Sequence, residues 1–159
     1  MKIAVVILNW NTKDYLRMFL PPLLDSVAMF NGGVSSLETS LAENGSRQAD
    51  GQPDWAEVVV ADSASTDGSM EMMAEKFPSV RRIPLEKNYG FTGGYNRALK
   101  MLCDNPSEDI APASGETARS IPYDLFILLN SDIEVTRDWL RPLADWMKEH
   151  PECGACGPK

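Results

Sequence analysis

Short apolar runs separated by amphipathic stretches are the dominant pattern along this chain. Three runs have the length of a strand: Ile3–Leu8, 57–62 and 124–130. Continuous runs of Val, Ile and Leu, without polar alternation, are typical of parallel strands that are buried on both faces. A shorter run at 80–84 ends in a proline, which indicates a strand at the edge of the sheet.

Apolar residues at helical spacing follow each of these runs. The predicted helices begin at about Lys13, span 69–77 and 95–103, and begin again after Thr136, which we expect to act as an N-cap. Pro21 and Pro22 fall inside the first helix and should kink or restart it, and Pro142 should bend the last one. Residues 154–158 have the composition of one further strand start.

This alternation of strands and helices predicts the α/β class, as an open, mostly parallel sheet with helices on both faces. A length of 159 residues is close to that of one domain. The polar stretches at 31–53 and 104–122 are rich in Gly, Ser, Asn and Pro, and we expect them to be surface loop insertions.

The formal net charge of −8 argues against a nucleic-acid partner. The window 81–100 has the opposite balance, with Arg81, Arg82, Lys87, Arg97 and Lys100 against Glu86. Such a window is either a solvated face or a surface that receives a small anion such as a diphosphate. The chain has no 18-residue apolar run, so we expect no membrane span. It has no leader pattern and an odd number of cysteines, three, so we expect a cytoplasmic protein.

Polar residues directly after the predicted strands are the candidates for chemistry, because ligands of open parallel sheets bind outside the carboxyl ends of the strands. They are Asn9, Trp10 and Asn11, then Asp62 and Ser63, then Asn88 to Gly94, and finally Asn130, Ser131 and Asp132. Asp132 is either a hard oxygen ligand for Mg²⁺ or Mn²⁺ or the first residue of a turn. Asp62 either accepts hydrogen bonds from a ribose or base, or caps the backbone at Ser65 and Thr66.

Other sequence features give weaker signals. Residues 88–94 are predicted to form a Gly-rich turn. Its glycines match neither of the common phosphate-loop patterns, although they precede a predicted helix in the basic window, where an anion is favoured. Cys153 and Cys156 have redox-motif spacing but lie at a predicted strand start, so we interpret them as structural. His150 is the single histidine and provides no catalytic triad.

Four segments in order, 5–11, 59–69, 88–96 and 128–135, resemble the inverting family 2 glycosyltransferases of the GT-A type, especially the rhamnosyltransferase-like branch. The resemblance covers nearly the whole chain apart from the two polar stretches. It implies a Rossmann-like half that binds a nucleotide-diphosphate-sugar linked to UDP or dTDP. It also implies Mg²⁺ or Mn²⁺ as cofactor, with Asn130-Ser-Asp132 as a variant of the family's Asp-x-Asp metal motif and Asp132 as the metal ligand.

The remaining roles implied by the resemblance concern the donor. Asn9, Trp10 and Asn11 would lie beside the base, Asp62 would take the nucleoside, and Ser63 leaves the preference between uridine and thymidine open. The ribose and sugar side would be contacted from the segment that contains Asn88, Gly90, Phe91, Gly93, Gly94 and Asn96.

The family's general base lies well beyond the metal motif, and Asp67 and Glu134 do not have its position. We therefore expect residues 1–159 to be the donor-binding part of a larger enzyme, truncated at its C-terminus and inactive alone. A glycan or lipid-linked acceptor, a contact with the inner face of the membrane in the full-length protein, and a homodimer through an unpaired sheet edge are the expected partners.

Two other classes stay open. A nucleotidyltransferase-like enzyme shares the sheet and the metal, but it would have a Gly-rich basic loop in place of Asn9-Trp-Asn11. A non-catalytic nucleotide-binding or interaction domain could have the same fold.

Overall fold

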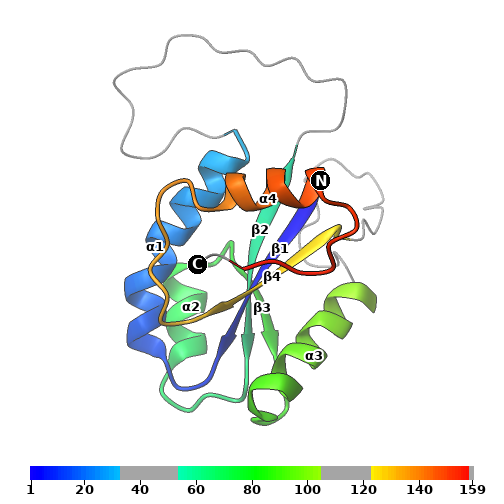
Figure 1. The fold of residues 1–159 in the computed structure, drawn as a ribbon. Coiled ribbons are helices and arrows are strands. Elements are labelled where there is room, and N and C mark those ends of the chain that lie inside the picture. The colour runs from blue at the N-terminus through cyan, green and yellow to red at the C-terminus, as the bar shows by residue number, and fades with distance from the viewer. Residues whose placement is uncertain (33–53, 105–122, 158–159) are drawn as a thin grey trace, which may run out of the picture.

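The computed structural model describes residues 1–32, 54–104 and 123–157. Strands and helices alternate along these residues (Figure 1). The strands are β1 (Lys2–Asn9), β2 (Trp55–Asp62), β3 (Arg81–Pro84) and β4 (Leu125–Asn130). The helices are α1 (Lys13–Phe30), α2 (Ser69–Lys76), α3 (Gly90–Asp104) and α4 (Leu140–Glu149). Most of the predicted polar stretches 31–53 and 104–122 lies outside the described residues.

The strands form one parallel sheet in the order β3-β2-β1-β4, which confirms the α/β class. Asn9 pairs with Asp62 in register and Leu8 pairs with Asn130, so the strands end at one common edge. The chain passes from β1 to β2 to β3 in one direction, and β4 lies on the other side of β1. The strand order therefore reverses between β1 and β4. β3 is an edge strand, as its proline indicated.

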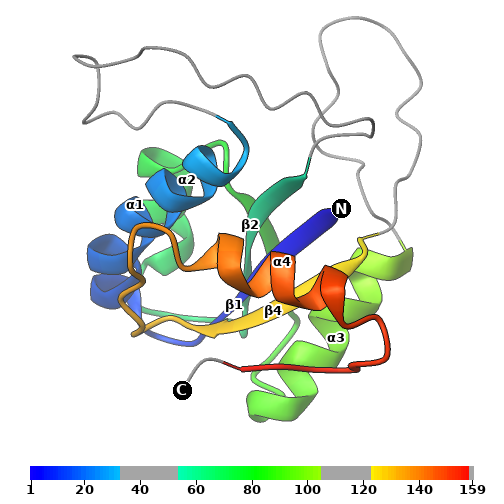
Figure 2. The ribbon, with the colours of Figure 1, turned by 45° about the horizontal axis from the view of Figure 1, so that its top comes forward.

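Helices cover both faces of the sheet (Figure 2). Residues of α1, α2 and α4 pack on one face against Val5 and Ile7 of β1. Residues of α3 pack on the other face against Ala4 and Val6. β1 is thus buried on both sides, which explains its unbroken apolar run. β4 is more exposed than its hydrophobicity suggested, since it lies at the second edge of the sheet.

α1 does not restart at its prolines, because one helix runs through Pro21 and Pro22. Both prolines lie on the exposed side of α1, together with Arg17 and Met18, whose carbonyl groups lose their intrahelical partners. Water can donate hydrogen bonds to those carbonyls at the surface, so the helix tolerates both prolines.

The expectations for the C-terminal region also need correction. α4 begins at Leu140, with Trp139 as its N-cap, and Thr136 does not cap it. Pro142 therefore falls in the first turn, where its missing N–H would have no intrahelical partner, and it does not sit in the helix interior. Residues 154–157 form no strand.

The Gly-rich segment forms part of a helix, which corrects the prediction of a turn over 88–94. α3 begins at Gly90, where φ is +70°, and the Asn88 Oδ1 atom accepts a hydrogen bond from the Gly90 amide at 2.7 Å. Gly94 faces β1 so closely that an added Cβ would lie 2.7 Å from Leu8 Cδ1. This glycine therefore allows close packing of α3 on β1.

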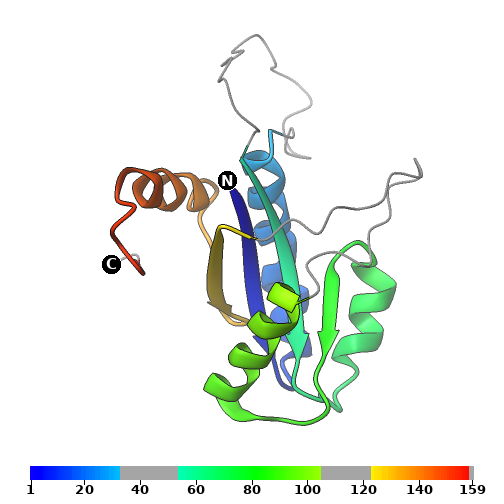
Figure 3. The same cartoon turned by 90° about the vertical axis from the view of Figure 1, so that its right-hand side faces the viewer.

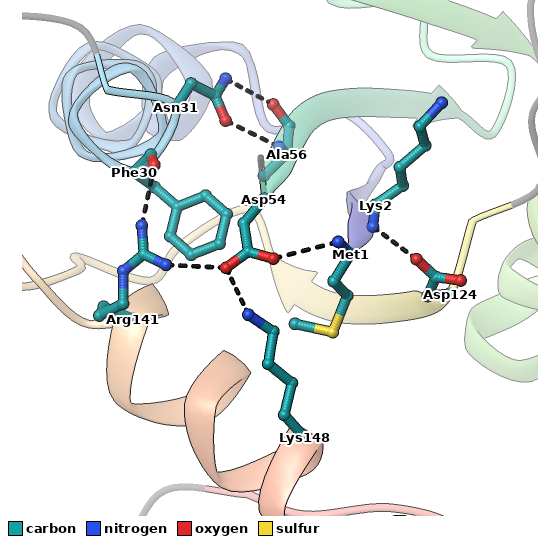
Figure 4. A network of polar contacts seen from close by, with 9 residues as sticks. All are labelled: Met1, Lys2, Phe30, Asn31, Asp54, Ala56, Asp124, Arg141 and Lys148. Carbon is teal, nitrogen blue, oxygen red and sulfur yellow. Dashed lines mark hydrogen bonds and ion pairs between the residues drawn. The ribbon is translucent and has the colours of Figure 1, made fainter. Parts of the chain in front are cut away.

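α4 is anchored at the amino ends of the strands by the carboxylate of Asp54 (Figure 4). This carboxylate contacts the Met1 amine at 3.0 Å, the Arg141 guanidinium at 3.0 Å and the Lys148 ammonium. Arg141 also donates to the Phe30 carbonyl at 3.0 Å and lies over the Phe30 ring. The contacts join the start of β1, the residue before β2, the end of α1 and the face of α4.

Among the helices of the described residues, none combines the length and apolar character that a membrane span requires.

Candidate functional site

A pocket of about 270 Å³ lies at the carboxyl edge of the sheet, where the strand order reverses between β1 and β4. Its walls come from the end of β1, the start of α1, the start of α3 and the end of β4. The lining residues are Leu8, Thr12, Tyr15, Phe91, Asn130, Ser131 and Asp132. The reversal point of an open parallel sheet is the position at which such folds bind ligands, so the pocket is the candidate site.

The polar side of this pocket is the segment Asn130-Ser131-Asp132. Asp132 is exposed, and within the described residues its carboxylate has no hydrogen-bond or ion-pair partner. The same residues hold no cluster of three or more His, Cys, Asp or Glu side chains suited to a metal. A free carboxylate next to an amide and a hydroxyl fits Mg²⁺ or Mn²⁺, since both prefer oxygen ligands and share them with substrate phosphates.

Two aromatic rings form the apolar side of the pocket. Phe91, at the start of α3, is 63% exposed, and Tyr15, in the first turn of α1, is 50% exposed. Phe91 belongs to a segment that the sequence singled out, whereas Tyr15 stands in the sequence only as an apolar position at helical spacing. The signal that could have found Tyr15 is its place three residues after Thr12, at the carboxyl end of a buried strand.

A second polar cluster holds the loop after β1 against the loop after β2. The Asn9 amide donates to Asp62 Oδ1 at 2.6 Å and to Ser65 Oγ at 3.0 Å. The other Asp62 oxygen accepts from the Ser65 amide at 2.9 Å. Asn9 and Asp62 also accept backbone bonds from Ser63 and Leu85 at 2.8 Å. These bonds confirm the capping role for Asp62 at Ser65, and they tie the ends of the two central strands together.

The same cluster continues to the start of α1. Asn11 donates its amide to Ser65 Oγ at 2.9 Å, and its side chain accepts from the Thr66 amide at 2.8 Å. The Thr12 hydroxyl bonds Asn9 and does not cap α1. The cap comes from the neighbouring loop, because Asp67 Oδ2 accepts from the Lys13 amide at 2.9 Å.

Asp67 is bonded on its other oxygen as well, by the amide and hydroxyl of Ser69 at the start of α2. Burial alone would raise the pKa of Asp67, but the hydrogen bonds from Ser69 and Lys13 outweigh it, and the pKa lies below its ordinary value. Asp67 therefore stays ionised and caps the first turns of two helices.

Both loops contain a residue in the left-handed region. Asn11 has φ +55°, which asparagine tolerates, and Ala64 has φ +59°, which is strained for alanine. Strain of this kind persists where surrounding contacts hold the backbone, and it is commonest at functional sites.

The structure separates the predicted site residues into three groups. Phe91, Asn130 and Asp132 line the pocket together. Asn9, Asp62 and Ser63 converge at the β1–β2 edge but are buried, with Asp62 only 3% exposed and the Ser63 hydroxyl without a partner in the described residues. The remaining predicted residues lie outside the pocket lining: Trp10, Asn11, Asn88, Gly90, Gly93, Gly94 and Asn96.

Comparisons with known proteins find similarity to glycosyltransferases. The family described as Glycosyl transferase family 2 matches residues 36–104. The chain is 28% identical over 101 residues to the N-acetylglucosaminyl-diphospho-decaprenol L-rhamnosyltransferase of Mycobacterium tuberculosis. That match covers 64% of this chain and 30% of the relative, so this chain spans well under half of the relative's length.

Solved structures show the same fold at low identity. S. aureus TarS 1–349, crystallised with UDP-GlcNAc, has a TM-score of 0.59 and 19% identity, over 100% of this chain and 37% of that chain. The mannosyltransferase PcManGT from Pyrobaculum calidifontis, with GDP-Man and Mn²⁺, has a TM-score of 0.55 and 17% identity, over 91% and 32% of the two chains. The open parallel sheet of this chain matches these GT-A structures, and its residues 36–104 match the glycosyl transferase family 2 model.

Proposed function

We propose that this domain binds a nucleotide-diphosphate-sugar and contributes the donor site of an inverting glycosyltransferase. The observation that carries the proposal is the exposed Asp132 carboxylate, which has no partner among the described residues, in a pocket at the reversal point of the sheet. The family match and the two ligands named for the solved relatives, UDP-GlcNAc and GDP-Man, support a nucleotide-sugar as the ligand class.

Asp132 would hold a Mg²⁺ or Mn²⁺ ion, with Asn130 as a neutral neighbour. When bound, such an ion offsets the negative charge of the diphosphate leaving group. The chain's own residues bind and orient the donor. Leu8, Tyr15 and Phe91 keep water away from the inner part of the pocket, and this lowers the local dielectric around the charges.

The base would lie beside Trp10 and Asn11, on the β2 side of the pocket. Trp10 is 54% exposed and offers a ring for stacking. Asp62 is too buried to meet solvent, and both of its oxygens are bonded to neighbours. We therefore assign Asp62 two functions: it holds the loop that presents Trp10, and it contacts the nucleoside only where the ligand reaches below the surface.

We assign the general base to none of the described residues. Asp67 accepts bonds from Lys13 and Ser69, and the exposed Glu134 does not line the pocket. The donor would be linked to UDP or dTDP, and the acceptor would be a glycan or lipid-linked molecule, as the name of the mycobacterial relative suggests. A larger enzyme of this kind would work at the inner face of the membrane and could pair as a homodimer.

The test is calorimetric titration of the 159-residue chain with UDP, dTDP and GDP and their sugar conjugates, with and without Mn²⁺. We expect Mn²⁺-dependent binding that Asp132→Asn abolishes without changing the melting temperature. Asp138→Asn, a change of another exposed aspartate in the same connection, is the matched control and should bind as the parent does.

Two results would contradict the proposal. Unchanged binding by Asp132→Asn would remove the metal assignment. A parent chain that binds no nucleotide or nucleotide-sugar would favour the interaction domain, whereas preference for a free nucleoside triphosphate would favour the nucleotidyltransferase-like enzyme.

A further inference from the structure

We infer that the pocket receives the sugar ring of the donor, held between Tyr15 and Phe91, and that these two rings determine which sugar is accepted. The inference rests on the proposed function, since it assumes that the ligand is a nucleotide-sugar. It goes beyond it by assigning one part of the ligand to one pocket, and by giving a specificity role to Tyr15.

The two rings reach the pocket from opposite faces of the sheet. Tyr15 belongs to α1, on the face that carries Val5 and Ile7, and Phe91 belongs to α3, on the face that carries Ala4 and Val6. Figure 3 shows α1 and α3 on the two sides of the strands. Side chains from both faces therefore line the pocket at the end of β1.

Each ring rests against a second aromatic ring. Tyr15 stacks on Phe19 with a centroid distance of 6.2 Å and an interplanar angle of 14°. Phe91 meets Tyr95 edge to face at 4.9 Å, and the Tyr95 hydroxyl donates to the Leu129 carbonyl at 2.9 Å. These contacts orient both rings before a ligand binds.

Half or more of each ring nevertheless remains in water. Burying an aromatic side chain stabilises a protein by about 2 kcal/mol, and two large apolar groups at a pocket mouth are more typical of a binding surface than of a solvated loop. The rings have this surface available for a ligand.

The size and the chemistry of the pocket favour a sugar. Its volume of about 270 Å³ lies just below the usual range of roughly 300–1,000 Å³ for sites that enclose a whole drug-sized ligand. It therefore suits one ring of a nucleotide-sugar. A sugar has apolar C–H faces and a polar rim, and the pocket offers two aromatic walls with Thr12, Asn130, Ser131 and Asp132 between them.

A nucleobase would also stack on aromatic rings, but another residue serves it better. Trp10 is exposed outside the pocket, in the loop that is bonded to the end of β2. With the base at Trp10 and the diphosphate at Asp132, the sugar is the part of the donor that remains to fill the pocket.

The experiment compares a nucleoside diphosphate with its sugar conjugate on the same variants. Tyr15→Ala and Phe91→Ala are titrated in Mn²⁺ with UDP and UDP-GlcNAc, dTDP and dTDP-rhamnose, and GDP and GDP-mannose. For the pair that the parent prefers, each variant should bind the conjugate about tenfold more weakly and the free diphosphate within about twofold of the parent. Tyr15→Phe should bind both as the parent does, because the ring is kept.

Met18→Ala is the matched control, since Met18 is exposed on α1 one turn later but does not line the pocket. An equal loss for diphosphate and conjugate would overturn the inference and assign the rings to the nucleoside. No loss for either would overturn it by showing that the rings do not touch the ligand. If the parent itself binds neither class, the proposed function fails first, and the two failures are thus distinguishable.

Discussion

Two carboxylates at opposite edges of the parallel sheet, Asp54 and Asp132, have opposite environments. At the amino edge, Asp54 is 14% exposed and contacts the Met1 amine, Arg141 and Lys148. At the carboxyl edge, Asp132 is exposed, and no described residue bonds its side chain. The Asp54 carboxylate is paired within the chain, whereas the Asp132 carboxylate is available beside a pocket.

This difference distinguishes a carboxylate that stabilises the fold from one that is available to bind a ligand. A carboxylate surrounded by cations stabilises the elements that carry those cations, and Asp54 thereby fixes α4 against α1 and β2 (Figure 4). An exposed carboxylate without a partner adds nothing to stability, so its place at the reversal point of the sheet is better explained by binding. Replacing Asp54 should therefore lower the stability of the fold and leave ligand binding unchanged. Replacing Asp132 should weaken ligand binding and leave the stability unchanged.

The largest effect on stability is expected from Asp54→Ala. Removing the carboxylate leaves three cationic groups near one another without an anion, and we expect a loss of about 2 kcal/mol in the free energy of unfolding. This figure is kept low because Arg141 and Lys148 are partly exposed. Urea denaturation measures the loss, and Mn²⁺-dependent nucleotide binding by the folded variant should be unchanged.

The same variant tests a pH dependence. Burial raises the pKa of Asp54, but contacts with Lys148 and the Met1 amine lower it further, to a net value below its ordinary 3.8. The stabilisation is therefore fully present above that ordinary value and is lost as the pH falls through the folded-state pKa. The stability gap between parent and Asp54→Ala should narrow in acid. Asp145→Ala, on the exposed side of α4, is the control and should show no gap.

A smaller loss is expected from Asp67→Ala, at the carboxyl edge. The change removes the acceptor of the Lys13 and Ser69 amides, and losing a cap of this kind costs roughly 1 kcal/mol. Unlike Asp54→Ala, it should also weaken nucleotide binding several-fold. Thr12 and Tyr15 line the pocket from the start of α1, so loss of the cap should displace them. Asp67→Asn keeps one acceptor oxygen, so its stability and its nucleotide binding should lie between those of the parent and those of Asp67→Ala. A variant with normal binding and reduced stability would show that this loop supports the fold alone.

The sequence predicted the sheet well because its signals are local. The apolar runs of β1 and β2 and the proline that ends β3 depend on burial within a strand, and their structural positions agree with prediction. Helix starts were less predictable where a cap comes from another part of the chain. Asp67 caps α1 across 54 positions, and no pattern near Lys13 reveals this contact.

The site was predictable only in part for the same reason. Phe91, Asn130 and Asp132 meet in one pocket, and each follows or faces a strand end that the sequence marked. Tyr15 was missed because an aromatic at helical spacing is usually a core residue. The glycines of 88–94 were interpreted as a turn, although Gly94 is required by the approach of α3 to β1, a tertiary contact.

Gly94→Ala should sharpen the comparison by changing the pocket more than the fold. Alanine favours a helix interior by up to about 1 kcal/mol, but the new Cβ would lie 2.7 Å from Leu8 Cδ1, so Leu8 must move. Because Leu8 lines the pocket, we expect donor binding to weaken several-fold while stability falls by about 1 kcal/mol or less. Gly154→Ala, whose added Cβ would meet nothing within 4 Å, is the control. Unchanged binding in Gly94→Ala would show that the Leu8 wall adapts freely.

The smallest effect is expected from Glu57→Gln, which tests whether Glu57, a carboxylate of β2 away from the pocket, behaves like Asp54. Glu57 accepts a hydrogen bond from the Tyr123 hydroxyl, and burial raises its pKa above the ordinary 4.5, against the attraction of Arg81. The folded state then holds the proton more tightly than the unfolded state, so the contribution of Glu57 to stability declines as the pH rises above 4.5.

Glutamine keeps an acceptor for Tyr123 and removes the buried charge, while Arg81 loses an attractive neighbour. The two changes oppose each other, and we expect a difference of less than about 0.5 kcal/mol at neutral pH. Urea denaturation at pH 7 and pH 5 measures it, and the variant should gain relative to the parent at the higher pH. A loss of 2 kcal/mol at pH 7 would show that Glu57 acts as a paired structural anion like Asp54.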